Sequence, residues 1–399
     1  MQRFFDDEGK HFAVLLSLGF AYAGLADAGE VLSTIDRIPE GDNEAWIREW
    51  SATAERLEAE ADEAIASGHD VSARTRLLRA ATYFDHASAA SPGSTDPGRF
   101  TSFWERHRLC WDRAVDRFEV PVERVQIPYE GTTLAGYLFK PAEAGRDDRR
   151  PTIILNNGSD GPIHSQWSLG GRAAVARGWN AITFDGPGQG QALHQQHLYF
   201  RHDWEKVITP VVDFLVARTD VDPDRIALQG ISQGGYWAPR AAAFESRIAA
   251  LVADPGVVRV ASSWEMHMPP DLVALLDDPA NQADFDALMA ADPDPERKAM
   301  LAWRCAPYGT TSVFQSLLEA RKMTLDDDTI ARIQCPTAIL DPDHEQFWPG
   351  QPRQFFDKLT CDKRLIRFTE SEGADWHCEP AAQSLRDERV FDFLEDVLG

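Results

Sequence analysis

The sequence is poor in cysteine and in basic residues for its length. Its five cysteines are scattered along 399 residues, and no pair is spaced as Cys-x-x-Cys. We therefore expect reduced thiols in a cytoplasmic protein instead of a disulfide framework. Lysine and arginine total 40 against 64 aspartates and glutamates, a formal net charge of -24. Because nucleic acids and anionic membranes favour basic surfaces, we expect neither as a partner, and a neutral or cationic small-molecule substrate fits better.

A long hydrophobic run is also absent. The uncharged stretch 12–26 contains the small-residue pattern Ala21-Tyr22-Ala23, yet it is too short to span a bilayer comfortably. Residues 1–10 hold more acidic than basic side chains, whereas a secretory signal peptide begins with a positive segment. We predict a buried helix over 12–26 in place of a signal peptide or a membrane anchor.

What the sequence does contain is an apolar segment, 225–229, that runs into Gly230-Ile-Ser-Gln-Gly234 and then into a helix-like stretch. A Gly-x-Ser-x-Gly between a strand and a helix is typical of a nucleophile elbow, in which a strained turn exposes the serine oxygen. A glycine-rich turn with an ordinary serine shares the motif, but the flanking strand and helix favour a nucleophile. Ser232 is therefore the predicted nucleophile of a serine hydrolase.

A catalytic histidine is expected further along the chain, because the acid and then the histidine follow the serine in enzymes built on such an elbow. Three histidines follow Ser232, namely His267, His344 and His377. His377 comes after the strand-like segment 364–369 and before a final amphipathic segment. That position is the carboxyl end of the last predicted strand, where ligands gather in open α/β sheets. We predict that His377 is the general base.

The acid is expected after the preceding strand, for which the segment 335–340 is the candidate. Three carboxylates follow it: Asp341, Asp343 and Glu345. In the common pattern of this loop the acid lies three residues after a turn residue, here Pro342, which favours Glu345. Its carboxylate would accept the Nδ1 proton of the histidine and stabilise the imidazolium. Asp341 and Asp343 stay as alternatives, and no second group of ligands accompanies them, so we expect no metal.

An oxyanion hole would combine two backbone N–H groups, one of them directly after the nucleophile. Gln233 supplies the first. The second is expected in the loop 156–161, where Ser159 is the candidate donor. Asp160 adjoins it, and a carboxylate there would oppose an oxyanion unless it points away or serves the leaving group.

A glycine-rich turn over 185–190 follows the apolar segment 180–184. It has neither the Gly-Lys-Ser/Thr ending nor the Gly-x-Gly-x-x-Gly spacing of phosphate-binding loops. We predict a tight turn after a core strand.

The chain divides into three parts. Residues 1–118 have helical periodicity and are predicted to be an N-terminal helical domain, with an aromatic core that includes Trp46 and Trp50. Residues 119–258 and 333–399 alternate apolar strands with helices, which indicates a mostly parallel sheet covered on both faces. Residues 259–332 interrupt this alternation and are predicted to be a helical lid insertion over the nucleophile. The predicted strands are 124–128, 133–139, 151–155, 180–184, 225–229, 248–253, 337–340 and 364–369.

Strand, elbow, acid loop and histidine loop together resemble an α/β-hydrolase. Two further features narrow the resemblance: a long helical segment before the core, and the pairing of the loop 156–161 with the motif 184–190. Together they are similar to the branch that contains 2,6-dihydroxypseudooxynicotine hydrolase, the fungal polyketide-shortening hydrolases and proteins resembling the fermentation-respiration switch protein. The resemblance extends over nearly the whole chain. Glu345 departs from it, because an aspartate is commoner at that position.

The resemblance implies an α/β-hydrolase fold and a Ser-His-acid triad that acts without a metal or another cofactor. The implied reaction is hydrolysis of a carbon–carbon bond next to a carbonyl in an aryl ketone or polyketide chain. His377, once protonated by Ser232, would supply that proton to the departing carbanion. Glu265 and His267, near the start of the lid, are candidates to assist, and ordinary polar lid residues are the alternative.

Two other functions stay open. An esterase or acyltransferase would use the same residues with a different leaving group or a different second nucleophile. A non-catalytic binding protein on the same fold is the other alternative, because a fold does not fix a function. A homodimer is one option for the oligomeric state, which the sequence does not decide.

Overall fold

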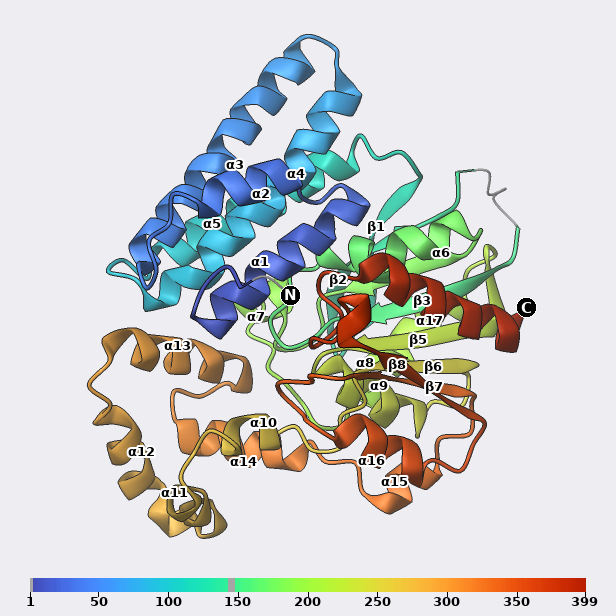
Figure 1. The fold of residues 1–399 in the computed structure, drawn as a ribbon. Helices are drawn as coiled ribbons and strands as arrows, with labels where there is room; N and C mark the ends of the chain where they lie inside the picture. The colour runs from blue at the N-terminus through green and yellow to red at the C-terminus, as the bar shows by residue number, and fades with distance from the viewer. Residues whose placement is uncertain (1–2, 143–147) are drawn as a thin grey trace. The chain divides into compact units, whose positions relative to one another are not determined.

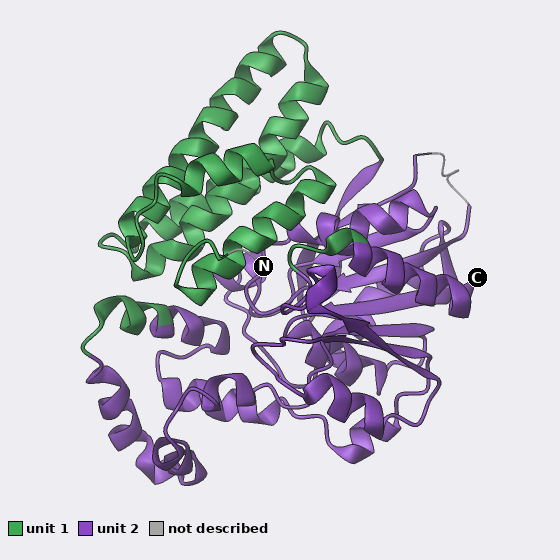
Figure 2. Ribbon diagram, in the orientation of Figure 1, with its two compact units in different colours: residues 1–120, 293–300, 380–384 green, residues 121–292, 301–379, 385–399 purple. Residues whose placement is uncertain are grey.

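The computed structural model describes residues 3–142 and 148–399, which form two compact units (Figure 2). Unit 1 comprises residues 1–120, 293–300 and 380–384. Unit 2 comprises residues 121–292, 301–379 and 385–399 and contains the β-sheet and the elbow serine.

Unit 1 is built mainly from helices α1 to α5 (Figure 1). Helices α3, α4 and α5 pack side by side, and their aromatic side chains form a core in which Trp50 and Tyr83 have ring centroids 5.2 Å apart. The start of α3 is capped by Asp42, whose carboxylate accepts the N–H of Ala45 at 2.8 Å. The helical N-terminal region predicted from periodicity is thus confirmed. The helix bounds are α1 Glu8–Phe20, α2 Ala28–Ile35, α3 Asn43–Ala66, α4 Asp70–Ala90 and α5 Arg99–Val115.

The uncharged stretch 12–26 lies mostly in α1, which continues into a short 3-10 turn over Ala21–Ala23. The helix buries one apolar face through Val14, Leu15 and Phe20. The structure therefore shows the buried helix that the sequence predicted. Among the residues that the structure describes, no helix is both long and apolar enough to cross a membrane.

Unit 2 contains one eight-stranded sheet with the order β1-β2-β4-β3-β5-β6-β7-β8. Strands β1 and β2 are antiparallel to their neighbours, and the remaining pairs are parallel. This is the mostly parallel sheet predicted from the alternation of strands and helices. The strand bounds are β1 Val122–Tyr129, β2 Thr132–Phe139, β3 Arg150–Asn156, β4 Asn180–Phe184, β5 Val221–Ile231, β6 Ala250–Asp254, β7 Thr337–Pro342 and β8 Lys363–Phe368.

The middle of the sheet is buried on both faces. Every residue of β4 and of β6 is buried, whereas β8, at the edge, buries only Ile366 and Phe368. Continuous apolar strands arise because helices cover a parallel sheet on both sides. Helices α8 Glu205–Val216 and α9 Gly234–Ala242 pack against strands on one face. Helices α6 Arg172–Ala176 and α17 Gln383–Leu398 lie on the other (Figure 1).

Several strands extend beyond their predicted ends, and the extensions of β5 and β7 include polar residues. Strand β5 begins at Val221, four residues before Arg225, because Val221 pairs with Arg150 across a register shift. The polar segment between them hid this pairing from a search for apolar runs. Strand β7 continues through Asp341 and Pro342, which pair with Arg367 and Phe368 of β8. Asp341, expected in the loop after the strand, is therefore a strand residue.

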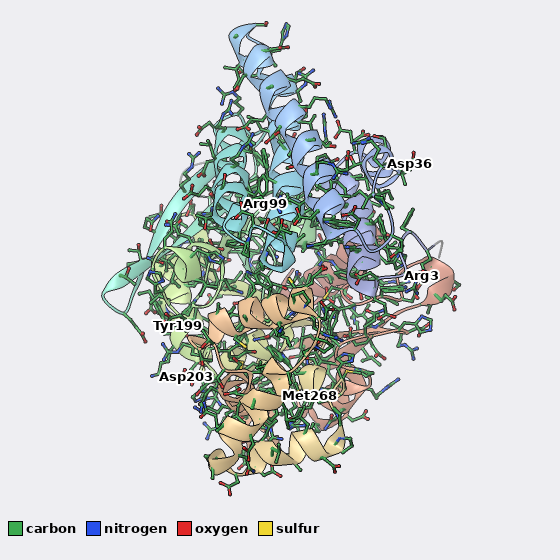
Figure 3. The ribbon with its side chains drawn as sticks, turned by 90° about the vertical axis from the view of Figure 1, so that its left-hand side faces the viewer. Arg3, Asp36, Arg99, Tyr199, Asp203 and Met268 are labelled. Carbon is green, nitrogen blue, oxygen red and sulfur yellow. The ribbon has the colours of Figure 1, made fainter. Side chains whose placement is uncertain are left out.

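The segment 259–332, between β6 and β7, is helical and has a small apolar cluster of its own around Phe285 and Phe314. Its helices include α12 Gln282–Ala290, α13 Pro295–Cys305 and α14 Val313–Lys322. The segment is attached to the loop before α8: the N–H of Phe200 donates to the carbonyl of Pro307 at 2.7 Å. Tyr199, labelled in Figure 3, packs against Gly309 in the same connection.

Candidate active site

Ser232 lies at the junction between β5 and α9. Its φ of 56° is in the left-handed region, which a residue with a side chain adopts only when the surrounding structure holds it there. A Cβ on Gly230 would stand 2.0 Å from the carbonyl oxygen of Gly234, so the close turn requires glycine at that position. The N–H of Ser232 donates to the carbonyl of Asp254, at the end of β6, at 2.6 Å. The backbone thus has the shape of a nucleophile elbow.

His377 lies in the loop that follows β8. Its Nε2 is 3.0 Å from the Oγ of Ser232, and its side chain is buried. The backbone N–H of His377 donates to Oε1 of Gln346 at 3.0 Å, which fixes this loop to the loop after β7. The rings of Phe347 and Trp348 lie beside the imidazole, with centroids 4.7 and 5.7 Å away.

Glu345 lies on the other side of the imidazole. Its two carboxylate oxygens are 2.9 and 2.8 Å from Nδ1 of His377. Oε1 also accepts the backbone N–H groups of Phe347 and Trp348, at 2.9 and 3.0 Å. A carboxylate held by two backbone donors is fixed in place and stays available as an acceptor for the Nδ1 proton. The structure thus brings Ser232, His377 and Glu345 into one continuous chain of contacts.

The two alternative carboxylates point elsewhere. Asp341 lies 3.5 Å from the guanidinium of Arg367, and Asp343 pairs with the same arginine. Burial raises the pKa of Asp341 above its usual range. Because Arg367 is on β8, both aspartates join the ends of neighbouring strands.

His344, adjacent to Glu345, pairs with Asp375 instead of Ser232. Its Nδ1 lies 2.7 Å from Oδ2 of Asp375, and the backbone N–H of His344 donates to the carbonyl of Asp375 at 2.8 Å. Hydrogen bonding to Asp375 raises the pKa of His344. The pair joins the acid loop to the histidine loop, because His344 directly precedes Glu345 and Asp375 lies two residues before His377.

Of the two predicted oxyanion donors, Gln233 directly follows the elbow serine and Ser159 lies in the loop after β3. Among the described residues, the backbone N–H groups of Gln233 and Ser159 have no acceptor. Gly158 approaches the nucleophile so closely that a Cβ there would stand 2.8 Å from the Cβ of Ser232. Asp160 is exposed, and its carboxylate accepts the hydroxyl of Ser159 at 3.0 Å.

The loop after β3 is held in place by buried side-chain amides. Oδ1 of Asn157 accepts the N–H of Gly158 at 2.8 Å, and its Nδ2 donates to the carbonyl of Gly161 at 2.6 Å. Gln189, in the glycine-rich turn after β4, donates to the carbonyls of Asn157 and Gly158 at 3.0 and 2.6 Å. Its Oε1 accepts the N–H of Gly186 at 2.9 Å. The turn predicted to be only a tight connection therefore also braces the loop beside Ser232.

The structure does not bring the proposed assisting residues to Ser232. The carboxylate of Glu265 forms ion pairs with Arg259 and Arg321, both at 2.7 Å. These contacts fix α10 Ser262–Glu265 within the helical segment, as expected for an ordinary polar residue. His267 is exposed, and in the described part of the chain its ring has no contact with Ser232 or with the other triad candidates.

The helical segment does reach the residue after the nucleophile. Nε2 of Gln233 lies 3.6 Å from Sδ of Met323, which follows α14. Tyr308 is buried, and its ring lies 5.1 Å from that of Phe200 and 6.2 Å from that of Trp264. The surroundings of the elbow are therefore rich in aromatic rings.

Relatives among known proteins cover the whole chain. "Hydrolase LUC6" of a Fusarium species is 30% identical over 100% of this chain and 99% of its own length. The chain belongs to the α/β-hydrolase superfamily. A second relative, "20-hydroxy-prefusarin hydrolase FUS2" of Gibberella moniliformis, is 28% identical over 100% of this chain and 99% of its own length. The chain is accordingly an enzyme, which removes the non-catalytic alternative.

Two further comparisons concern the hydrolase fold and its elbow. The crystal structure of 2,6-dihydroxy-pseudo-oxynicotine hydrolase superimposes with a TM-score of 0.74 at 24% identity, covering 95% of each chain. The family model for acetyl xylan esterase matches residues 188–265, a segment that includes the elbow. The resemblance inferred from sequence is thus confirmed for the superfamily and the fold.

Sequence reasoning missed two groups of residues at this site. Gln189 was passed over because it lies in a turn without a binding motif, and its amide acts across space on a different loop. The second group is Asp254, whose backbone carbonyl accepts the N–H of Ser232, and the buried Glu379, two residues after His377. The available signals were an aspartate that ends an apolar strand and a glutamate two residues after the predicted histidine.

Proposed function

We propose that Ser232, His377 and Glu345 form the catalytic triad of a hydrolase that cleaves a carbon–carbon bond next to a carbonyl. The substrate is proposed to be a small aryl ketone or a polyketide-like molecule. The observation that carries this proposal is the unbroken chain of contacts from Glu345 through His377 to Ser232, at 2.8 and 3.0 Å. The aromatic rings around it would suit an aryl group.

In the first half of the reaction His377 takes the proton of Ser232 through Nε2 while the serine oxygen attacks the substrate carbonyl. Glu345 stabilises the imidazolium through Nδ1. The oxyanion that forms is stabilised by the backbone N–H groups of Gln233 and Ser159. When the tetrahedral intermediate collapses, the carbon–carbon bond breaks and its electron pair leaves as a carbanion. A second carbonyl in the substrate delocalises that charge, and the imidazolium of His377 supplies the proton.

In the second half water hydrolyses the acyl-enzyme. His377 takes a proton from the water, which attacks the acyl carbon, and the proton then returns to Ser232. The products are a carboxylic acid and a ketone. No proton remains on the enzyme, so the imidazole is again neutral for the next turnover.

The proposal is tested by product analysis with an aryl 1,3-diketone. The parent is expected to yield one carboxylic acid and one methyl ketone, with one oxygen of the acid derived from the solvent in H₂¹⁸O. Ser232→Ala, which lacks the nucleophile, should yield neither. Turnover by the parent of aryl esters alone, with diketones left intact, would overturn the carbon–carbon assignment.

Ester hydrolysis is the second candidate function. It is favoured by the match of residues 188–265, which include the elbow, to the acetyl xylan esterase model. Such a reaction would use the same triad but needs no proton for a carbanion, because an alkoxide leaves. Comparing kcat/KM for matched aryl acetates and aryl 1,3-diketones shows which of the two reactions the enzyme favours.

A further inference from the structure

A buried cluster of charged residues lies behind the proposed triad. It consists of Asp254 at the end of β6, Glu379 in the histidine loop, and Arg386 and Asp387 on α17. All four are fully or almost fully buried, with at most 1% of each residue exposed. Nη1 of Arg386 lies 3.5 Å from Oδ2 of Asp254, and Nη2 donates to Oδ1 of Asp387 at 2.8 Å.

The charges in this cluster do not balance if every group is ionised. Within the cluster one guanidinium would face three carboxylates, although Arg172 and Arg177 also act electrostatically on Asp387. An uncompensated charge in a protein interior costs several kcal/mol. The hydrogen bonds do not balance either. Among the described residues, Oδ1 of Asp254 and both carboxylate oxygens of Glu379 have no donor. A proton on one of these carboxyls would supply a donor and remove one negative charge.

Glu379 is the carboxyl that keeps the proton. Burial raises its pKa well above its usual range, and the charge of Asp254 raises it further. Burial also raises the pKa of Asp254 to about 6 and that of Asp387 above its usual range, although the guanidinium of Arg386 favours the ionised form of both. Glu345 and His377, on the neighbouring loops, also act on Asp254 electrostatically.

The carbonyl of Asp254 connects the two parts of the proposed triad. It accepts the N–H of Ser232 at 2.6 Å and the thiol of Cys378 at 3.4 Å. Cys378 and Glu379 directly follow His377, and both have left-handed backbones, with φ of 58° and 45°. Neither is a glycine, so this conformation persists only if contacts on both sides hold it. Glu379 and Asp254 are both buried and act on each other electrostatically, and an interaction between them is in the right place to do so.

We propose that Glu379 is a positioning residue that shares one proton with Asp254 and so fixes the histidine loop against the strand that supports the elbow. The positioning role rests on the proposed function, whereas the shared proton does not. Proton sharing is therefore tested by stability, and positioning by the reactivity of Ser232.

The first experiment compares the melting temperature of Glu379→Gln with that of the parent from pH 5 to 9. A glutamate in an unfolded chain loses its proton near pH 4, whereas the folded protein keeps it to higher pH. The contribution of a raised pKa is fully present below the unfolded pKa and is lost as pH rises towards the folded pKa. The melting temperature of the parent should therefore fall relative to Glu379→Gln as pH rises. Glu388→Gln, a change at an exposed glutamate of α17, should stay parallel to the parent.

A Glu379→Gln curve parallel to the parent would overturn the shared proton. If this variant does not fold, the parent itself gives the answer. A protonated buried carboxyl has its own carbonyl stretching band in the infrared spectrum. The band at neutral pH supports the proposal, and its absence overturns it.

The second experiment measures the rate at which a fluorophosphonate labels Ser232 in the parent, Glu379→Gln and Glu379→Leu. The amide of glutamine still donates to Asp254, so Glu379→Gln should retain most of the parent rate. Glu379→Leu removes the donor and should slow labelling about tenfold. Equal rates in the two variants would overturn the positioning role. An unlabelled parent would instead count against the proposed function, while the stability result would stand.

Discussion

Oε2 of Glu345 lies 2.8 Å from Nδ1 of His377, and both side chains are buried. This contact separates Glu345 from Asp341 and Asp343, which follow the same strand but pair with Arg367. Of the three, Glu345 therefore has the geometry to hold the imidazole tautomer that accepts a proton from Ser232.

Glu345→Gln is expected to lower kcat by about 10³-fold, because a neutral amide neither fixes this tautomer nor stabilises the imidazolium. Asp343→Asn removes a carboxylate of the same loop that contacts Arg367 and should leave kcat within a few-fold of the parent. Steady-state kinetics on one substrate checks both. If Asp343→Asn lost activity while Glu345→Gln stayed active, Glu345 would not be the acid of the triad.

Gln189 is predicted to act through the loop beside the nucleophile. Gln189→Met removes the donors to the carbonyls of Asn157 and Gly158, so the N–H of Ser159 should lose its fixed position. We expect kcat to fall about tenfold with KM little changed, since an oxyanion donor acts on the transition state. The melting temperature should also fall, because buried polar groups lose their partners.

Gln195→Met is the matched control for this change. Gln195 is an exposed glutamine in the same part of the chain. The Gln195→Met substitution should leave both kcat and the melting temperature close to those of the parent. A rise in KM at constant kcat in Gln189→Met would show that Gln189 serves ground-state binding and not the oxyanion loop.

Asp375→Asn is expected to lower the pKa of His344, since Asp375 raises it in the parent. The stabilisation from this pair is present below the usual histidine pKa of about 6.5 and is lost as pH rises through the folded-state pKa. NMR titration of the His344 ring protons in the parent and in Asp375→Asn measures the change. An unchanged titration of His344 would mean that the ion pair does not form in solution.

Cys378 adjoins His377, but its thiol is expected to resist alkylation. Burial raises its pKa well above the usual range, and the thiolate is the reactive form. Iodoacetamide at neutral pH should therefore leave Cys378 unmodified and activity intact, while the half-buried Cys361 reacts sooner. Peptide mass mapping reads both sites. Rapid labelling of Cys378 with loss of activity would show that the histidine loop opens.

Much of this arrangement could be predicted from local sequence patterns. Uninterrupted apolar runs predicted the central strands, because strands covered on both faces need few polar residues. The motif around Ser232 predicted the elbow, and chain order located His377 and Glu345 at strand ends that meet on one edge of the sheet.

The remaining features depend on contacts between residues far apart in the sequence. Glu265 was a plausible assisting residue until the fold placed Arg259 and Arg321 around its carboxylate. The role of Gln189 depends on carbonyls more than thirty positions away. Asp254 and Arg386 are likewise far apart along the chain and meet only in the folded protein. No local pattern encodes such pairs, so sequence reasoning could not find them.

The central claim is that Ser232 is an activated nucleophile. Intact-mass analysis after fluorophosphonate treatment tests it most directly, with the parent and Ser232→Ala compared under the same conditions. The account predicts one adduct on the folded parent and none on the variant, because the chain of contacts from Glu345 through His377 activates this hydroxyl alone. An unlabelled folded parent, or an adduct that persists in Ser232→Ala, would contradict it.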